Sequence, residues 1–353
     1  MKKNHLILGL VVIAALVALV VWGRDRIHFD FAIFRSQLAM ADWAKIGIAT
    51  ACIYMGYIFR SVRWALFIRH SQKVSPLTLL GTQVIGFTAV ALIGRVADPV
   101  RPYLVSRKTG LPLAGQVAVY IVERMFDLGS MALIFSVVLL TTHEALPHPE
   151  LLLKVAKGGL LATVALAVFT VTVRLAGGAV AAFIEKTLGV LSHKLAHSIG
   201  HKIRTFRTGL DTMRSFADFG GAALLSIAMW LVITTAYLET TRAFVASPQL
   251  AAMTLPKCMV LMASSMVASG FQLPILGWFT QIGIIAAAMS SFFSVAAEPA
   301  TACSATLLLV TFLSIVPVGL IWAQFEHVSL RKITVESEHA EEELADDDPQ
   351  PKL

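Results

Sequence analysis

A short basic segment contains the residues best suited to bind an anion. Arg95 and Arg101 flank Asp98, and Arg107 follows them. A guanidinium group can bind two phosphate oxygens at once, and Asp98 can pair with either arginine and hold it in place. Two prolines in the segment interrupt helical hydrogen bonding. We therefore expect these four residues to bind substrate from a loop outside the core, or else to form a basic loop that only orients the chain in a membrane.

A second group of charges, Glu123, Arg124 and Asp127, lies within a long apolar run. Glu123 and Asp127 are four residues apart and so share one face of a helix, while Arg124 is spaced to pair with Asp127. Ionisable residues within a membrane span are costly, and they usually face a cavity or one another. We expect these three residues to shape or gate a polar path for substrate. The alternative is a structural ion cluster that satisfies itself.

A third group lies at a break in a late apolar run. Pro274 and Gly277 interrupt the run, and Gln272 and Gln281 bracket the interruption. Broken helices often line the binding sites of membrane transporters. We expect these four residues to contribute to substrate binding, the alternative being a simple turn between two helices.

Two further groups have ordinary explanations. Arg60, Arg63 and Trp64 come near the end of an apolar run, where long basic side chains typically extend toward the membrane surface. Three histidines are spaced by one helical turn within an amphipathic stretch: His193, His197 and His201. No cysteine or carboxylate joins them, so we expect a polar helix face there rather than a metal site, and we expect no cofactor.

The composition indicates which elements must position these residues. The chain is 57% hydrophobic and 14% charged, whereas soluble domains carry about 25% charged residues. Apolar runs of about 18 residues or more are typical of membrane helices. The sequence therefore predicts an all-α, polytopic membrane helical bundle of about eight spans, with re-entrant or broken helices and two related halves.

The individual elements follow from the same pattern. Apolar runs predict helices over about 5–23, 45–69, 113–141, 151–173, 220–244, 255–273, 282–297 and 300–324. Amphipathic stretches over about 27–44 and 181–217 predict helices that lie at the membrane surface. We expect a single membrane domain over 1–330, followed by a disordered acidic cytoplasmic tail over 331–353.

The charge distribution predicts the partners and the orientation. Outside the acidic tail, basic residues outnumber acidic ones and lie beside apolar spans. This favours contact with anionic membrane lipids over nucleic acid. The short basic loops predict that both termini lie in the cytoplasm and that 142–150 lies outside. We expect the protein in the cell membrane, which is the inner membrane of cells that have two. For the basic residues after 94 to lie in the cytoplasm as well, the segment 77–110 must enter the membrane and return to the same side.

These motifs resemble those of the lysylphosphatidylglycerol synthase transmembrane, or flippase-like domain, family over about 5–330. The family pattern is an Arg-Trp pair, a Pro-x-Arg-x-Gly-Glu-x-x-Arg segment, a Glu-Arg-x-x-Asp helix motif and a late Pro/Gly-rich break. The corresponding positions here are Arg63-Trp64, 93–101, Glu123-Arg124-Met125-Phe126-Asp127 and 274–281. The chain departs from the pattern where it has Ile93, Ala97, Asp98 and Gln281 in place of proline, glycine and two glutamates.

The resemblance implies a protein that moves or handles an amphiphilic phospholipid or glycolipid between leaflets, and not an enzyme, since no synthase domain follows the membrane part. It is compatible with a separate lipid synthase as partner and with a homo-oligomer. One alternative is a membrane glycosyltransferase that uses a polyprenyl-phosphate donor, with Asp25 or Asp30 as its acid. Another is a scaffold that anchors a lipid synthase through 181–217.

Overall fold

The computed structural model describes residues 29–144, 146, 148–189, 200, 204, 215–270, 276–329, 333, 335 and 336. This part of the chain is helical and contains no strand. Its elements are α2 (Phe31–Ala39), α3 (Trp43–Ile68), α4 (Pro76–Ile93), η1 (Arg95–Ala97), α5 (Val100–Thr109), α6 (Leu113–Thr141), α7 (Pro149–Gly189), α9 (Phe216–Arg242), α10 (Pro248–Ala251), α11 (Leu255–Gly270), α12 (Leu276–Phe293), α13 (Ala297–Leu308), η2 (Leu309–Leu313) and α14 (Ile315–Phe325). The expected helix over 5–23 lies outside the described residues.

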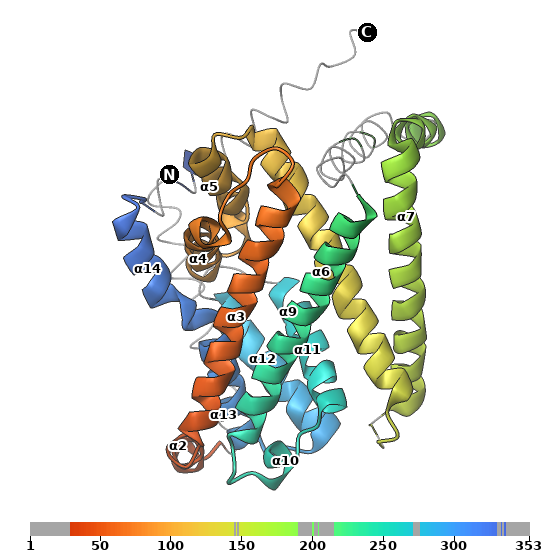
Figure 1. Cartoon of the computed structure of the whole chain (residues 1–353). Helices are drawn as coiled ribbons and strands as arrows, with labels where there is room; N and C mark the ends of the chain where they lie inside the picture. Colours follow the sequence, from red (N-terminus) through yellow and green to blue (C-terminus); the bar gives the residue numbers. More distant parts are fainter. Residues whose placement is uncertain are drawn as a thin grey trace.

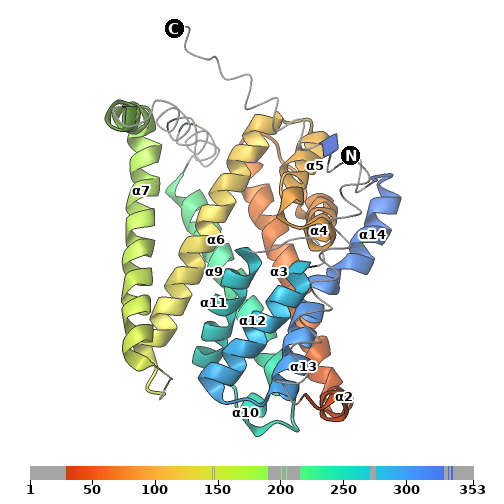
Figure 2. The same cartoon turned by 180° about the vertical axis from the view of Figure 1, so that it is seen from behind.

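The long helices form a bundle, which confirms the predicted all-α polytopic class. Helix α3 packs along α9, and α6 contacts both α9 and α7. In Figures 1 and 2, α7 stands at one edge, while α4, α5 and α14 gather at the opposite edge. Five described helices are long and apolar enough to cross a membrane, or six if α2 and α3 form one bent span, and α11 and α12 are shorter apolar helices. The expected relation between two halves stays a prediction.

The first amphipathic stretch forms a helix, but a shorter one than expected. Helix α2 begins at Asp30, whose carboxylate accepts hydrogen bonds from two backbone N–H groups of its first turn, and α3 begins in the same way at Asp42. Such carboxylates satisfy amide donors that have no partner within the helix. The axes of α2 and α3 differ by 76°. The backbone N–H of Asp30 also donates to Glu298 over 3.1 Å, which ties α2 to α13.

Helices α4 and α5 form a hairpin that turns at Gly94. This glycine has φ of 91°, a left-handed conformation that glycine adopts without strain. Near the end of α5, Lys108 pairs with Glu326 over 2.5 Å. Near the start of α4, Gly81 lies against the same glutamate. The end of α5 therefore lies near the first turns of α4, and the expected return of 77–110 to the same side of the membrane stays a prediction.

One expected helix boundary is wrong, and one expected helix contains an irregular turn. Helix α7 continues through the predicted end at 173 to Gly189, with a kink at Ala176. It therefore includes the beginning of the stretch 181–217, whose remainder lies outside the described residues apart from 200, 204 and 215–217. The expected helix over 300–324 is confirmed as one apolar span, Ala297–Phe325, in which the π-helical turn η2 lies between α13 and α14. In this turn the backbone N–H of Ser314 donates to the carbonyl oxygen of Leu309, five residues earlier, over 2.7 Å, which is the π-helical pattern.

The residues that follow α14 pack back onto α5. Ile333 is buried beside Val100 and Leu104, and the Tyr103 hydroxyl donates to Glu336 over 3.2 Å. Ile333 and Glu336 thus contribute to packing, although we expected the tail to be disordered from 331. The rest of the tail lies outside the described residues.

Candidate functional site

A cavity of about 560 Å³ opens in the centre of the bundle. Gly56, Asp127 and Trp230 line it from the middle of α3, α6 and α9. Its remaining lining comes from α4, η1, α11, η2 and the start of α14. The cavity therefore lies near the mid-depth of the long membrane helices, where polar groups are tolerated only if they are buried in protein or line a wet space.

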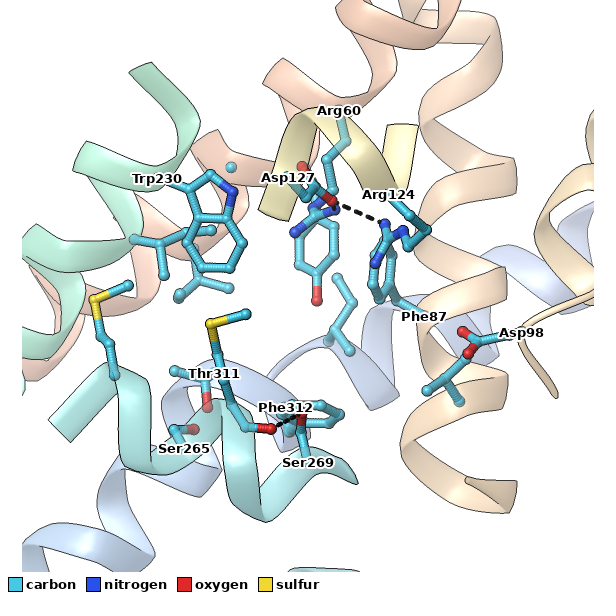
Figure 3. Close-up of a pocket in the computed structure, with 18 of the residues that line it drawn as sticks. Arg60, Phe87, Asp98, Arg124, Asp127, Trp230, Ser265, Ser269, Thr311 and Phe312 are labelled. Atoms are coloured by element: carbon cyan, nitrogen blue, oxygen red, sulfur yellow. Dashed lines mark hydrogen bonds and ion pairs between the residues drawn. The ribbon is translucent and has the colours of Figure 1, made fainter. Parts of the chain in front are cut away.

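The lining of the cavity has a charged end and an apolar wall. Figure 3 shows Arg60, Arg124 and Asp127 together at one end, with hydroxyl-bearing side chains across from them. The apolar part is formed by Ile53, Phe87, Val90, Leu128, Trp230, Ile233, Met262, Met266, Phe312 and Ile315. The cavity therefore offers a charged surface beside an apolar one.

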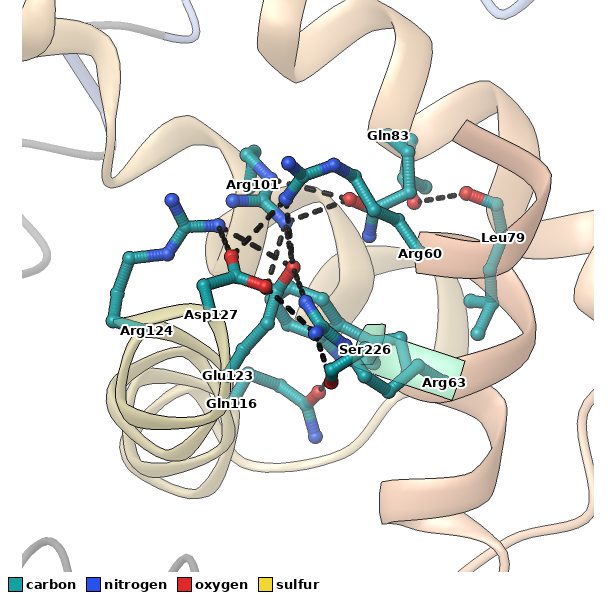
Figure 4. A network of polar contacts seen from close by, with 12 residues as sticks. Arg60, Arg63, Leu79, Gln83, Arg101, Gln116, Glu123, Arg124, Asp127 and Ser226 are labelled. Atoms are coloured by element: carbon teal, nitrogen blue, oxygen red, sulfur yellow. Dashed lines mark hydrogen bonds and ion pairs between the residues drawn. The ribbon is translucent and has the colours of Figure 1, made fainter. Parts of the chain in front are cut away.

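Two carboxylates on α6 organise a buried ion network behind the charged end. Arg63 of α3 lies 2.8 Å from Glu123 and 2.7 Å from Asp127. Arg101 of α5 lies 2.7 Å from Glu123. Arg60 and Arg124 contact both carboxylates at longer distances. Figure 4 shows the guanidinium groups surrounding the two acids.

Helical spacing explains why these groups meet. Arg60 and Arg63 are three residues apart on α3, and Glu123 and Asp127 are four apart on α6, so each pair presents one face. The Ser226 hydroxyl on α9 accepts a hydrogen bond from Arg63 over 2.6 Å. Each helix therefore supplies one side of the network. The predicted contact between Arg124 and Asp127 is also present, with 3.1 Å between the two side chains.

The expectation that Arg101 belongs to a loop outside the core is wrong. Arg101 is fully buried within α5, and its guanidinium group donates to Gln83 of α4 over 2.8 and 3.2 Å. It also lies 4.4 Å from the centre of the Phe87 ring, within the range of a cation–π interaction. Arg101 lies behind the cavity, not on its lining, and its closest charged partner is Glu123, not Asp98.

The other residues of the basic segment divide into two groups. Arg95 and Asp98 line the cavity and lie 3.9 Å apart. Arg95 also donates to the Ser269 carbonyl oxygen over 2.7 Å and to its hydroxyl over 2.9 Å, so it links η1 to the last turn of α11. Arg107 is exposed near the end of α5 and does not line the cavity, so the structure does not place it with the other predicted residues.

Of the residues predicted at the late break, Gln281 contributes to the cavity through contacts with residues that line it. Gln272 and Pro274 lie outside the described residues, and Gly277 lies at the start of α12 without lining the cavity. Gln281 is buried, and its side-chain amide donates to the Ser265 hydroxyl over 3.3 Å. Tyr237 donates to the same hydroxyl over 2.8 Å. Because Ser265 and Tyr237 line the cavity, Gln281 supports its neutral polar side.

Arg60, Arg63 and Trp64 were interpreted from the sequence as a helix end that extends toward the membrane surface, and this interpretation is wrong. All three side chains are buried, and the Trp64 indole donates to Gln116 of α6 over 3.0 Å. Arg60 precedes the end of α3 by two turns of helix. That depth was the one signal in the sequence that could have placed it in the membrane core.

The arginines of the site are suited to anion binding. Among the described residues, no group of three or more His, Cys, Asp or Glu side chains could hold a metal ion. Glu123 and Asp127 each contact several arginines, which stabilise the charged carboxylates. Arginine side chains are well suited to phosphate and other oxyanions.

The bundle and its cavity define a multi-pass integral membrane protein with a charged site at membrane depth. The chain belongs to the family described as lysylphosphatidylglycerol synthase TM region, which it matches over residues 6–321. No curated protein matches the chain, and no solved structure matches it. Membership in this family is consistent with a role related to lipids.

Proposed function

We propose that this protein binds an amphiphilic phospholipid or glycolipid in the central cavity and moves or handles it between the leaflets of the cell membrane. The observation that carries the proposal is the position of the cavity near the mid-depth of the long helices. There its lining combines the charged side chains of Arg60 and Arg124 with an apolar wall. Both termini lie in the cytoplasm in this proposal. A separate lipid synthase and a second copy of the chain are its candidate partners.

The size of the cavity suits part of a lipid. Its volume of about 560 Å³ falls within the roughly 300–1,000 Å³ typical of small-molecule pockets. A phosphate or sugar headgroup with the first part of a hydrocarbon chain fits such a space. The rest of the chain would extend from the cavity into the bilayer, where its hydrophobic surface is stable.

Breaks in helices at the cavity support movement as well as binding. The hairpin turn brings Arg95 and Asp98 to the lining, and the π-helical turn η2 supplies Thr311 and Phe312. Interrupted helices in membrane transporters often surround the substrate, and π-helical turns occur frequently at functional sites. These segments are therefore the parts of the proposed path that we expect to move.

The glycosyltransferase alternative receives less support. Asp30 accepts backbone hydrogen bonds from Ala32 over 2.8 Å and from Ile33 over 3.3 Å, which is an ordinary structural role at the start of a helix. Asp25 lies outside the described residues. Transfer of sugar from a polyprenyl-phosphate donor by the purified protein would favour this alternative over lipid movement.

A cavity-filling variant tests the proposal. Ile233 lines the cavity from α9, whereas Leu231 on the same helix does not line it and is exposed. In proteoliposomes containing a fluorescent lipid, Ile233→Trp should slow transbilayer movement at least about tenfold, equivalent to about 1.4 kcal/mol. Leu231→Trp serves as the matched control and should behave as the unaltered protein. Equal movement with both variants would reject the cavity as the lipid path.

A further inference from the structure

The charged end of the cavity holds more positive than negative charge. Among the described residues, four arginines contact Glu123 and Asp127: Arg60, Arg63, Arg101 and Arg124. The group therefore carries two more positive charges than negative ones. Excess charge in a poorly hydrated region is unfavourable unless an opposite charge accompanies it. A bound anion would supply that opposite charge.

The distances divide the four arginines into two pairs. Arg63 and Arg101 approach the carboxylates to 2.7–2.8 Å and do not line the cavity. Arg60 stays 3.3 Å or more from both carboxylates, and Arg124 stays 3.1 Å or more. Both of these more distant arginines line the cavity. The inner pair thus compensates the two acids, and the outer pair supplies the excess charge that a ligand would meet.

The outer pair retains capacity for a ligand. Arg124 lines the cavity, and about a third of its side chain is exposed. Arg60 and Arg124 come from different helices and meet at the same end of the cavity (Figure 3). Two guanidinium groups in this arrangement can bind the oxygens of one phosphate group.

The cavity offers little to a cationic group. Its two described lining carboxylates are Asp127, which contacts three arginines, and Asp98, which lies beside Arg95. The wall across from the arginines is polar but neutral, with Ser265, Ser269 and Thr311 (Figure 3). An ammonium group would therefore meet neutral hydroxyls or acids that already have arginine partners.

We propose that the cavity selects lipids whose phosphate headgroup carries a net negative charge, with Arg60 and Arg124 as the specificity-determining residues. Zwitterionic lipids and aminoacylated lipids, lysylphosphatidylglycerol included, bind less tightly because their ammonium groups find only neutral hydroxyls or carboxylates that already have arginine partners. A cationic group that loses water without gaining a partner opposes binding. This inference rests on the proposed function, because it names the class of lipid that the same cavity takes.

Competition among three lipids with identical acyl chains tests the selectivity. The full-length protein is delipidated in detergent, and native mass spectrometry measures binding of phosphatidylglycerol, phosphatidylcholine and lysylphosphatidylglycerol. The same lipids, fluorescently labelled on the acyl chain, report transbilayer movement in proteoliposomes. We expect phosphatidylglycerol to bind at least about tenfold more tightly than the other two.

Variants of the outer pair test the residue assignment. Arg124→Gln and Arg60→Gln should each reduce the preference for phosphatidylglycerol, whereas Arg124→Lys should keep most of it because the charge remains. Arg35→Gln removes an exposed arginine from α2 and is the matched control, with an unchanged preference expected. An Arg124→Gln protein that is folded and keeps the full preference would overturn the assignment.

The two readouts separate this inference from the proposed function. Equal binding of all three lipids, together with their movement between leaflets, would overturn the charge selectivity and leave the proposed function supported. Selective binding of phosphatidylglycerol without movement of any lipid would support the selectivity and reject the proposed transport.

Discussion

Arg101 and Glu123 form a buried ion pair with 2.7 Å between Nη2 and Oε2, and this pair joins α5 to α6. Neither side chain is appreciably exposed. The same guanidinium group donates to Gln83 of α4 over 2.8 Å. One arginine therefore connects three helices around the cavity. The hairpin of α4 and α5 is held to the bundle partly by charge, so these contacts are expected to determine its stability.

Removing Arg101 should destabilise the protein. Arg101→Ala would deprive Glu123 of its closest partner, and breaking a buried ion pair typically costs about 3–5 kcal/mol. Arg107→Ala on the same helix removes an exposed arginine and should change stability by about 0.5 kcal/mol or less. Thermal melting in detergent compares the two variants. If they melt at the same temperature, Arg101 does not contribute to packing.

The close approach of α5 to α4 depends on a glycine. A Cβ atom at Gly86 would overlap the Arg101 side chain, whereas a Cβ atom at Gly47 of α3 would meet open space. Gly86→Ala should therefore destabilise the protein by about 1–3 kcal/mol through overpacking. Gly47→Ala should be neutral or stabilising by up to about 1 kcal/mol, since alanine favours helix. Both values follow from melting in detergent, and stabilisation by Gly86→Ala would contradict the packing described here.

The hairpin predicts a labelling pattern for the two sides of the membrane. Single cysteines at Gln72, just before α4, and at Arg107, near the end of α5, should react with an impermeant maleimide from the same side. A cysteine at His148, in the turn that begins α7, should react from the other side. Reaction of the Gln72 and Arg107 positions from opposite sides would show that α4 crosses the membrane completely.

The membrane helices and part of the charged site were predictable because their signals are local. A long apolar run is visible in consecutive residues, and the spacing of Glu123 and Asp127 alone places both acids on one helix face. The pairing of Arg124 with Asp127 follows from the same spacing. The kink at Ala176 and the π-helical turn η2 both lie within apolar runs and were not predicted.

The sequence by itself determined the class of the protein, the location of most of its helices and the presence of charges within membrane spans. Only the tertiary structure decided that Arg63 and Arg101 compensate the two acids and that Arg60 joins Arg124 at the cavity. The physical reason is that lipid-facing and protein-facing sides of a membrane helix are both apolar, so hydrophobic periodicity does not identify which helices meet. Arg63 and Glu123 lie 60 positions apart, and only the packing of α3 against α6 brings their charges together.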